Sequence, residues 1–211
     1  MKEHPFAIGQ VIKEAWELTK AHLGFLIGFQ LIIFGIMALF GGLDPEGKWV
    51  LWQMLGWVVL ILVKMGLYNS SLLITGGIQP GFNQLYQNWR MLISWVIASF
   101  LFGLMFMIGF ALLIVPGLYI WARYGFFPFF ILDKDVGPIE ALKMSAKATE
   151  GIRWQVFLLF ISCLGLDILG ALFFGVGLLF TIPITLLAIA IVYRRITGTA
   201  QAEEQLIEDR K

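Results

Sequence analysis

Residues 91–122 contain no charged side chain, and this apolar stretch limits what the chain can fold into. An α-helix rises 1.5 Å per residue, so one straight helix over these residues would be about 48 Å long. Because the hydrocarbon core of a bilayer is about 30 Å thick, the stretch is too long for a single crossing. We therefore predict two membrane-spanning helices, 91–108 and 110–132, joined by a turn near Gly109.

The composition indicates that most of the chain lies in the same apolar environment. Of its 211 residues, 59% are hydrophobic and only 14% are charged. Soluble domains usually have about 45–50% apolar and about 25% charged residues, so a soluble domain of this size could not bury so much apolar surface. We predict an all-α polytopic membrane protein with about six transmembrane helices. The other four predicted spans are 23–40, 49–75, 154–174 and 176–193.

Positive charges are distributed unevenly between the two sides of such a protein. With six spans, both termini and the loops 76–90 and 133–153 lie on one side of the membrane. Cytoplasmic loops are enriched in Lys and Arg, so both termini are predicted to be cytoplasmic. The opposite side carries only Lys48, whereas the cytoplasmic side carries Lys2, Lys13, Lys20, Arg90, Lys134, Lys143, Lys147, Arg153, Arg194, Arg195, Arg210 and Lys211.

Two segments with helical periodicity precede pairs of predicted spans. In residues 8–20 and 138–150, apolar side chains form one helical face and charged side chains form the other. Helices of this kind lie in the plane of the membrane interface, and residues 82–90 precede the third span in a similar way. We interpret the chain as three units, each an interfacial amphipathic helix followed by a two-span hairpin. The units are 6–75, 79–132 and 136–195 of one transmembrane domain, 1–197, which precedes a polar cytoplasmic tail, 198–211.

Three charged residues, Lys64, Arg123 and Asp167, lie inside predicted spans. A charge near the bilayer centre costs about 2.5–3.5 kcal/mol on insertion scales, so it is usually paired, extended to the interface or functional. All three lie near the middle of the bilayer or in its cytoplasmic half, which allows Asp167 to pair with either Lys64 or Arg123. The sequence leaves open a structural ion pair, extension of a side chain to the interface, and a polar pathway or ligand site.

Arg123 and Asp133 are ten residues apart, close to three helical turns, so they are predicted to share a face of one helix. Arg123 could bind a lipid phosphate or the end of a neighbouring helix, and Asp133 could cap the following turn. Arginine binds phosphate bidentately. Lys64, Arg123, Asp133 and Asp167 are therefore our candidate polar or lipid-phosphate site, with an intramolecular clamp as the alternative for Arg123 and Asp133.

The sequence contains no catalytic motif that we can identify. It lacks a G-x-S-x-G turn, an H-E-x-x-H pair, a Walker loop and a G-x-G-x-x-G turn, and its two histidines, His4 and His22, both lie near the N-terminus. The single cysteine, Cys163, excludes an internal disulfide or a cysteine-based zinc cluster. A net charge of +1 argues against a nucleic-acid partner. We predict a non-enzymatic protein without catalytic residues, metal or cofactor.

A specific pattern of residues occupies the stretch 115–145. It consists of Pro116-Gly117, Arg123, Pro128-Phe129, Asp133 and Ala141-Leu142 followed by Ser145. The pattern resembles prokaryotic six-span proteins grouped with the membrane domain of glycerophosphoryl diester phosphodiesterases, and the ending from Ile182-Pro183 to Tyr193-Arg194 is similar as well. The resemblance implies six spans with cytoplasmic re-entry helices in the prokaryotic cytoplasmic (inner) membrane. Some relatives are fused to a phosphodiesterase, but this sequence contains no such domain, so the resemblance does not imply hydrolysis.

These observations favour a membrane protein that scaffolds partners or organises lipid. Membrane lipids are the expected partners, and a homo-oligomer or a cytoplasmic protein partner is compatible with the sequence. The alternative is a small transporter or channel for a lipid, an ion or a small solute. The three-unit repeat, the charges inside spans and the kink-forming prolines motivate that alternative.

Overall fold

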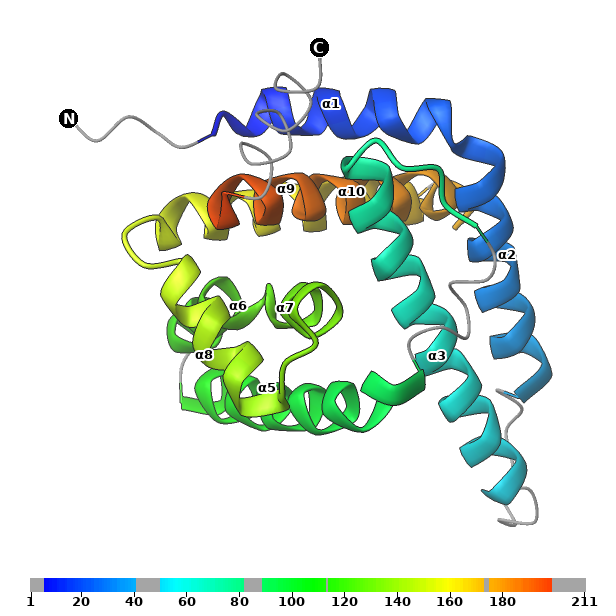
Figure 1. Ribbon diagram of the computed structural model, residues 1–211, viewed down its shortest axis with the longest axis horizontal. Coiled ribbons are helices and arrows are strands. Elements are labelled where there is room, and N and C mark those ends of the chain that lie inside the picture. The colour runs from blue at the N-terminus through cyan, green and yellow to red at the C-terminus, as the bar shows by residue number, and fades with distance from the viewer. Residues whose placement is uncertain (1–5, 41–49, 82–88, 113, 173–174, 199–211) are drawn as a thin grey trace.

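The computed structural model of the protein describes residues 6–40, 50–81, 89–112, 114–172 and 175–198. These residues form nine α-helices and one short 3-10 helix, η1, and they contain no β-strand. The elements are α1 (Ile8–Ala21), α2 (Leu23–Phe40), α3 (Val50–Thr75), η1 (Trp89–Met91), α5 (Leu92–Leu112), α6 (Ile114–Tyr124), α7 (Phe127–Lys134), α8 (Pro138–Ala148), α9 (Arg153–Leu172) and α10 (Leu178–Thr197) (Figure 1).

Five segments of the described chain are long and apolar enough to cross a membrane: α2, α3, η1 with α5, α9 and α10. Their boundaries lie close to those of five predicted spans. Only 22% of α2 and 11% of the most apolar part of Trp89–Leu112 are buried inside the protein. Helices that are apolar on all sides, and that leave those sides uncovered, are typical of membrane spans.

The predicted fourth span, 110–132, is not one continuous helix. It is divided into α6 and α7, which are separated by Gly125 and Phe126. At 1.5 Å per residue, α6 is about 16 Å long, roughly half the thickness of the hydrocarbon core. Pro128 lies in the first turn of α7. A proline there needs no backbone hydrogen-bond partner, whereas in a continuous helix it would remove the bond to the carbonyl of Tyr124.

Gly109 lies inside α5, which ends at Leu112, so the two helices are divided a few residues after the predicted turn near Gly109. A Cβ atom added at Gly109 would lie 3.1 Å from the backbone of Gly117 in α6 and 2.6 Å from the side chain of Ile120. A Cβ atom added at Gly117 would lie 3.0 Å from the backbone of Phe110. The two glycines therefore let the backbones of α5 and α6 touch, which is how small residues act in packed membrane helices.

The short helix α7 lies in the interior of the described fold, where every residue from Phe127 to Leu132 is buried. The ring of Tyr193, on α10, is fully buried and lies 5.3 Å from the ring of Phe129 and 4.9 Å from that of Phe130, measured between centroids. Tyr68, on α3, packs on Phe129 from another side, at 5.2 Å. Helices α3 and α10 thus cover the broken segment.

Both predicted interfacial helices that the structure describes pack on other helices of the fold. Figure 1 shows α1 running along α10, while α8 contacts α5, α6 and α7. Val11 and Ala15 are fully buried in α1, although Trp16 is 42% exposed. In α8, Leu142 is buried but Ile139 is 59% exposed. Periodicity predicted most of each buried face, but it did not predict that α1 packs on the third predicted unit and α8 on the second.

Two predictions fall largely outside the described residues. Of the predicted interfacial segment 82–90, only Trp89 and Arg90 are described, and they lie in η1. Of the predicted tail 198–211, only Gly198 is described. It ends α10 with a φ of 73°, a left-handed conformation that favours glycine.

Candidate anion-binding site

The four predicted site residues lie on four different helices: Lys64 on α3, Arg123 on α6, Asp133 on α7 and Asp167 on α9. Among the described residues, no hydrogen bond or ion pair joins any two of them. Lys64 is exposed on the surface of α3. The pairing of Asp167 with Lys64 or Arg123, which the predicted depths allowed, is therefore not formed within the described part of the chain.

Asp133 joins α7 to α10 rather than pairing with Arg123. Its Oδ2 atom accepts a hydrogen bond of 2.8 Å from the Tyr193 hydroxyl and lies 3.2 Å from Nζ of Lys134. The expectation that Arg123 and Asp133 share one helical face was wrong, because the break between α6 and α7 separates them. Asp135, with a φ of 50°, ends α7 instead of Asp133.

Asp167 has a partner on the neighbouring helix. The Thr185 hydroxyl of α10 lies 3.3 Å from Oδ2 of Asp167 and 3.0 Å from the carbonyl oxygen of Ile182, which are alternative acceptors for its one proton. Asp167 is only partly buried. This contact provides a polar link between α9 and α10, two helices that are otherwise largely apolar where they meet.

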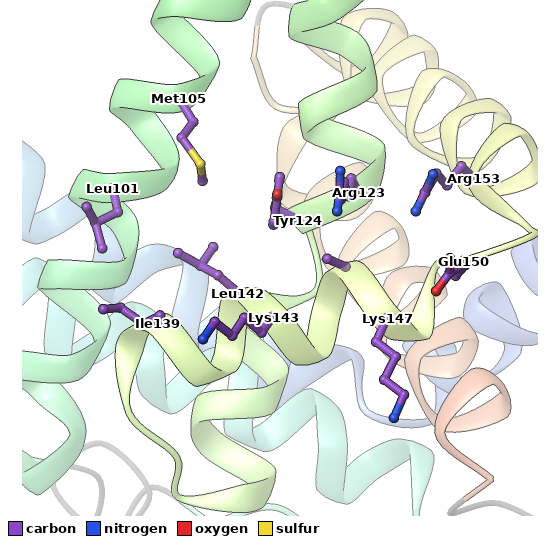
Figure 2. Close-up of a pocket in the computed structure, with 11 residues that line it drawn as sticks. Leu101, Met105, Arg123, Tyr124, Ile139, Leu142, Lys143, Lys147, Glu150 and Arg153 are labelled. Carbon is purple, nitrogen blue, oxygen red and sulfur yellow. The ribbon is translucent and has the colours of Figure 1, made fainter.

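Arg123 lines a cavity of about 500 Å³ between α5, α6, α8 and the start of α9. Figure 2 shows the side chains of these helices around it, with α8 along one side. We call this space the basic cavity. Its lining residues are Leu101, Met105, Arg123, Tyr124, Ile139, Leu142, Lys143, Ala146, Lys147, Glu150 and Arg153.

Hydrogen bonds to α8 hold Arg123 at the edge of the basic cavity. Arg123 is in the last turn of α6, where backbone carbonyls lose their helical partners. Its carbonyl accepts a hydrogen bond from the Ser145 hydroxyl, at 3.1 Å, and lies 3.2 Å from the Thr149 hydroxyl, whose one proton has the Ser145 carbonyl, at 3.0 Å, as an alternative acceptor. The Ser145 oxygen in turn accepts the N–H of Phe126, at 3.2 Å. Ser145 and Thr149 are fully buried, so these two hydroxyls satisfy the backbone exposed by the break between α6 and α7.

The lining of the basic cavity is strongly cationic. Four cationic side chains, those of Arg123, Lys143, Lys147 and Arg153, share the lining with one acidic side chain, that of Glu150. Figure 2 shows that Lys147 extends away from Arg123 and Arg153, so the two arginines are the more direct source of charge. Several cations around one concave, partly apolar space create a local potential that attracts anions.

Both arginines keep a buried N–H group without an acceptor. The Nε atoms of Arg123 and Arg153 are buried and have no hydrogen-bond partner in the described structure. The Arg123 guanidinium lies over the Tyr124 ring, 5.2 Å from its centroid. The Arg153 guanidinium lies 5.5 Å from the Tyr119 ring centroid, and its Nη1 donates to the Tyr119 hydroxyl at 2.8 Å. Aromatic rings therefore orient both guanidinium planes at the basic cavity, which both arginines line.

Of the residues that make up this cavity, the sequence identified only Arg123 as a site residue. Lys143, Lys147 and Glu150 were predicted only as the polar face of an interfacial helix, and Arg153 only as a cytoplasmic charge. One signal was present in the sequence: Arg123 and Arg153 flank, on either side, a segment whose charged face contains two lysines. The contact between α8 and α6 that brings them together could not be predicted from that signal.

Comparison with known proteins gives one match. A family model described as "Protein of unknown function (DUF975)" matches residues 49–200, which include every residue that lines the basic cavity. No curated protein and no solved structure matches the chain. The match is to an uncharacterised family, and the relation to the membrane domain of glycerophosphoryl diester phosphodiesterases stays a prediction.

Proposed function

We propose that this chain, which belongs to the DUF975 family of proteins of unknown function, binds the phosphate group of an anionic membrane lipid in the basic cavity. Its role would be to hold and organise lipid rather than to catalyse a reaction. The observation that carries the proposal is the group of four cationic side chains, those of Arg123, Lys143, Lys147 and Arg153, around one partly apolar cavity.

The chemistry of these donors favours a phosphate. A hydrogen bond to a charged group contributes about 1.5–3 kcal/mol, so a phosphate that accepts from both guanidinium groups would gain this contribution from each. Guanidinium groups are planar and offer parallel N–H donors, which match two oxygens of one phosphate. Lys143 adds a further positive charge to the lining. Glu150 limits the net charge, so the cavity suits a group with one or two negative charges.

The apolar part of the lining supports a lipid over a soluble phosphate. Leu101 and Met105 of α5, together with Ile139 and Leu142 of α8, form the wall opposite the arginines. A cavity with cations on one side and hydrocarbon on the other suits an amphiphile whose charged and apolar parts are adjacent. A protein with five helices suited to crossing a membrane also meets lipid at high local concentration.

The proposal places both termini and the basic cavity on the cytoplasmic side of the prokaryotic inner membrane. The uneven distribution of Lys and Arg supports this orientation. An orientation with both termini on one side needs an even number of crossings. We therefore count α6 and α7 together as the sixth crossing, and the burial of α7 from Phe127 to Leu132 supports this count. Broken helices are tolerated in a membrane where protein covers them.

Cysteine labelling tests the orientation. In a Cys163→Ser background, three variants each carry one new cysteine at an exposed position: Lys143, Ile78 or Val176. The variants are labelled in whole cells. A reagent that cannot cross the membrane should label only the Val176→Cys protein, because residue 176 lies between α9 and α10 on the outer side. Labelling of the Lys143→Cys or Ile78→Cys protein in intact cells would contradict the proposed orientation.

Lipid titration followed by native mass spectrometry tests the binding site. The purified full chain in detergent is titrated with phosphatidylglycerol, and the Kd is compared for the wild type, Arg123→Gln and Arg153→Gln. A hydrogen bond to a charged group contributes about 1.5–3 kcal/mol, so each variant should raise the Kd about tenfold or more. Arg90→Gln is the matched control, because it removes the same charge from η1, outside the basic cavity.

Two further ligands test whether the bound phosphate belongs to an anionic lipid or to a soluble molecule. Phosphatidylcholine, which has no net charge, should bind more weakly than phosphatidylglycerol, and inorganic phosphate should compete poorly at equal concentration. Strong competition by inorganic phosphate would show that the ligand is soluble rather than lipidic. Equal phosphatidylglycerol affinity in the wild type, Arg123→Gln and Arg153→Gln would refute the site.

The contact between Asp167 and Thr185 favours a second candidate function, transport of an ion or small solute. A carboxylate inside a span is costly, so such groups often mark a pathway for ions or protons. Pro183, inside α10, permits a local kink next to this contact. If the protein is a transporter, Asp167→Asn should abolish flux in proteoliposomes while leaving the folded fraction unchanged. Absence of flux in the wild type would leave lipid binding as the function.

A further inference from the structure

A second cavity, of about 450 Å³, lies between α6 and α9. We call it the apolar groove. Arg153 is its one charged lining residue, and the remaining lining is hydrocarbon and aromatic. The groove is lined by Leu118, Tyr119, Ala122, Arg153, Trp154 and Phe157.

The apolar groove and the basic cavity share a single residue, Arg153. Its guanidinium is fixed against Tyr119 by a hydrogen bond of 2.8 Å and by its position over the ring. Tyr119 lines only the groove, whereas Arg123 lines only the basic cavity. The Arg153 side chain therefore forms part of the boundary between a cationic space and an apolar space.

We infer that the apolar groove holds one hydrocarbon chain of the same lipid whose phosphate occupies the basic cavity. This inference rests on the proposed function. A phosphate that binds the Arg153 guanidinium lies at the boundary of the two spaces, so the chain attached to it can enter the groove without crossing a polar wall. A soluble phosphate would leave the groove unused.

The groove itself matches an acyl chain better than a polar ligand. The Tyr119 hydroxyl already accepts a hydrogen bond from Arg153, and Trp154 is the other uncharged lining residue with a polar group. Trp154 stacks on Phe157 with a centroid distance of 5.1 Å, and Trp154 is 69% exposed. An exposed tryptophan beside an arginine is typical of the membrane interface, where lipid headgroups and the first methylenes of their chains meet.

Photo-crosslinking tests this inference. The wild-type full chain is placed in nanodiscs of phosphatidylcholine that contain a small fraction of phosphatidylglycerol with a diazirine on an acyl carbon near the glycerol. Crosslinked residues are then mapped by mass spectrometry. We expect crosslinks to concentrate on Leu118, Trp154 and Phe157, and to fall about tenfold in Arg123→Gln, which lies outside the groove.

Three further measurements test whether the crosslinks are specific. A diazirine probe with a phosphatidylcholine headgroup should not concentrate in the groove. Trp154→Ala removes an exposed wall of the groove, a change that the fold should tolerate. It should lower groove crosslinks severalfold, with less effect on phosphatidylglycerol affinity than Arg123→Gln has. Val176→Ala, an exposed apolar change remote in sequence from the groove, should leave the crosslinks unchanged.

The outcomes distinguish failure of the inference from failure of the proposed function. If phosphatidylglycerol binding depends on Arg123 but crosslinks spread evenly over the apolar helices, the inference is wrong and the proposed function stands. If binding does not depend on Arg123, both are wrong. If the phosphatidylcholine probe crosslinks to Leu118 and Phe157 as strongly, the groove is a general lipid surface, and its coupling to the basic cavity is refuted.

Discussion

Replacement of Ser145 by alanine removes one oxygen atom, but it should destabilise the protein substantially. The Ser145 oxygen accepts the N–H of Phe126, and its proton is donated to the carbonyl of Arg123. Both backbone groups belong to the break between α6 and α7, and Ser145 is fully buried. Ser145→Ala leaves the Phe126 N–H without its acceptor, whereas the Arg123 carbonyl keeps its bond from Thr149.

The expected loss of stability follows from the difference between these two backbone groups, since only the Phe126 N–H loses its sole partner. A buried donor left without a partner costs about 1–3 kcal/mol, whereas loss of one of two bonds to a carbonyl costs less. We expect Ser145→Ala to lower the free energy of unfolding by about 2 kcal/mol. Thr149→Val should cost below about 1 kcal/mol, because the Arg123 carbonyl keeps its bond from Ser145. The double variant should cost more than the sum, since the carbonyl then loses both partners.

The assay is reversible unfolding in mixed micelles of detergent and SDS, followed by tryptophan fluorescence. Ser162→Ala is the control, because the Ser162 hydroxyl donates only to the Leu158 carbonyl on an exposed part of α9. It should change the free energy of unfolding by about 0.5 kcal/mol or less. Equal effects of Ser145→Ala and Ser162→Ala would refute the idea that α8 holds the break. Ser145 binds the backbone carbonyl of Arg123, which lines the basic cavity. Ser145→Ala should therefore also weaken phosphatidylglycerol binding.

Two further substitutions test how the helices pack. Gly109→Ala should destabilise the protein by about 1–3 kcal/mol, because its Cβ would meet the Gly117 backbone at 3.1 Å, whereas Gly103→Ala on the same helix has nothing within 4 Å and should be neutral or stabilising. Similar melting temperatures for these two variants would contradict the close contact of α5 with α6. Tyr193→Phe keeps the buried ring but removes the bond to Asp133, so it should cost about 1 kcal/mol in the same unfolding assay. An unchanged free energy of unfolding would mean that water replaces this bond.

The helices long and apolar enough to cross a membrane could be predicted because their signal is local. A window of apolar residues has the same meaning wherever it lies in the chain, since the bilayer solvates it directly. Predicted spans such as 23–40 and 154–174 therefore lie close to the helices observed, Leu23–Phe40 and Arg153–Leu172. The buried face of α1, which includes Val11 and Ala15, followed from helical periodicity for the same reason.

The break in the predicted fourth span could not be predicted from a local pattern. The sequence showed the apolar run and Pro128, but a proline inside a run predicts a kink as readily as a helix start. What separates α6 from α7 is the pair of hydroxyls on Ser145 and Thr149, which bind the Arg123 carbonyl. These residues are 22 and 26 positions away along the chain, so no local window contains both sides of the contact.

The candidate site also has one part that the sequence predicted and another that depends on contacts between distant segments. The sequence by itself determined that Arg123 is a charge beside long apolar helices, and the cost of such a charge made it a candidate. Only the tertiary structure decided that Arg123 meets Arg153 and α8 around one cavity, while Asp133 bonds to Tyr193 and Asp167 lies beside Thr185. Solvation by a bilayer depends on each segment alone, whereas the neighbours of a charge depend on how separate helices pack.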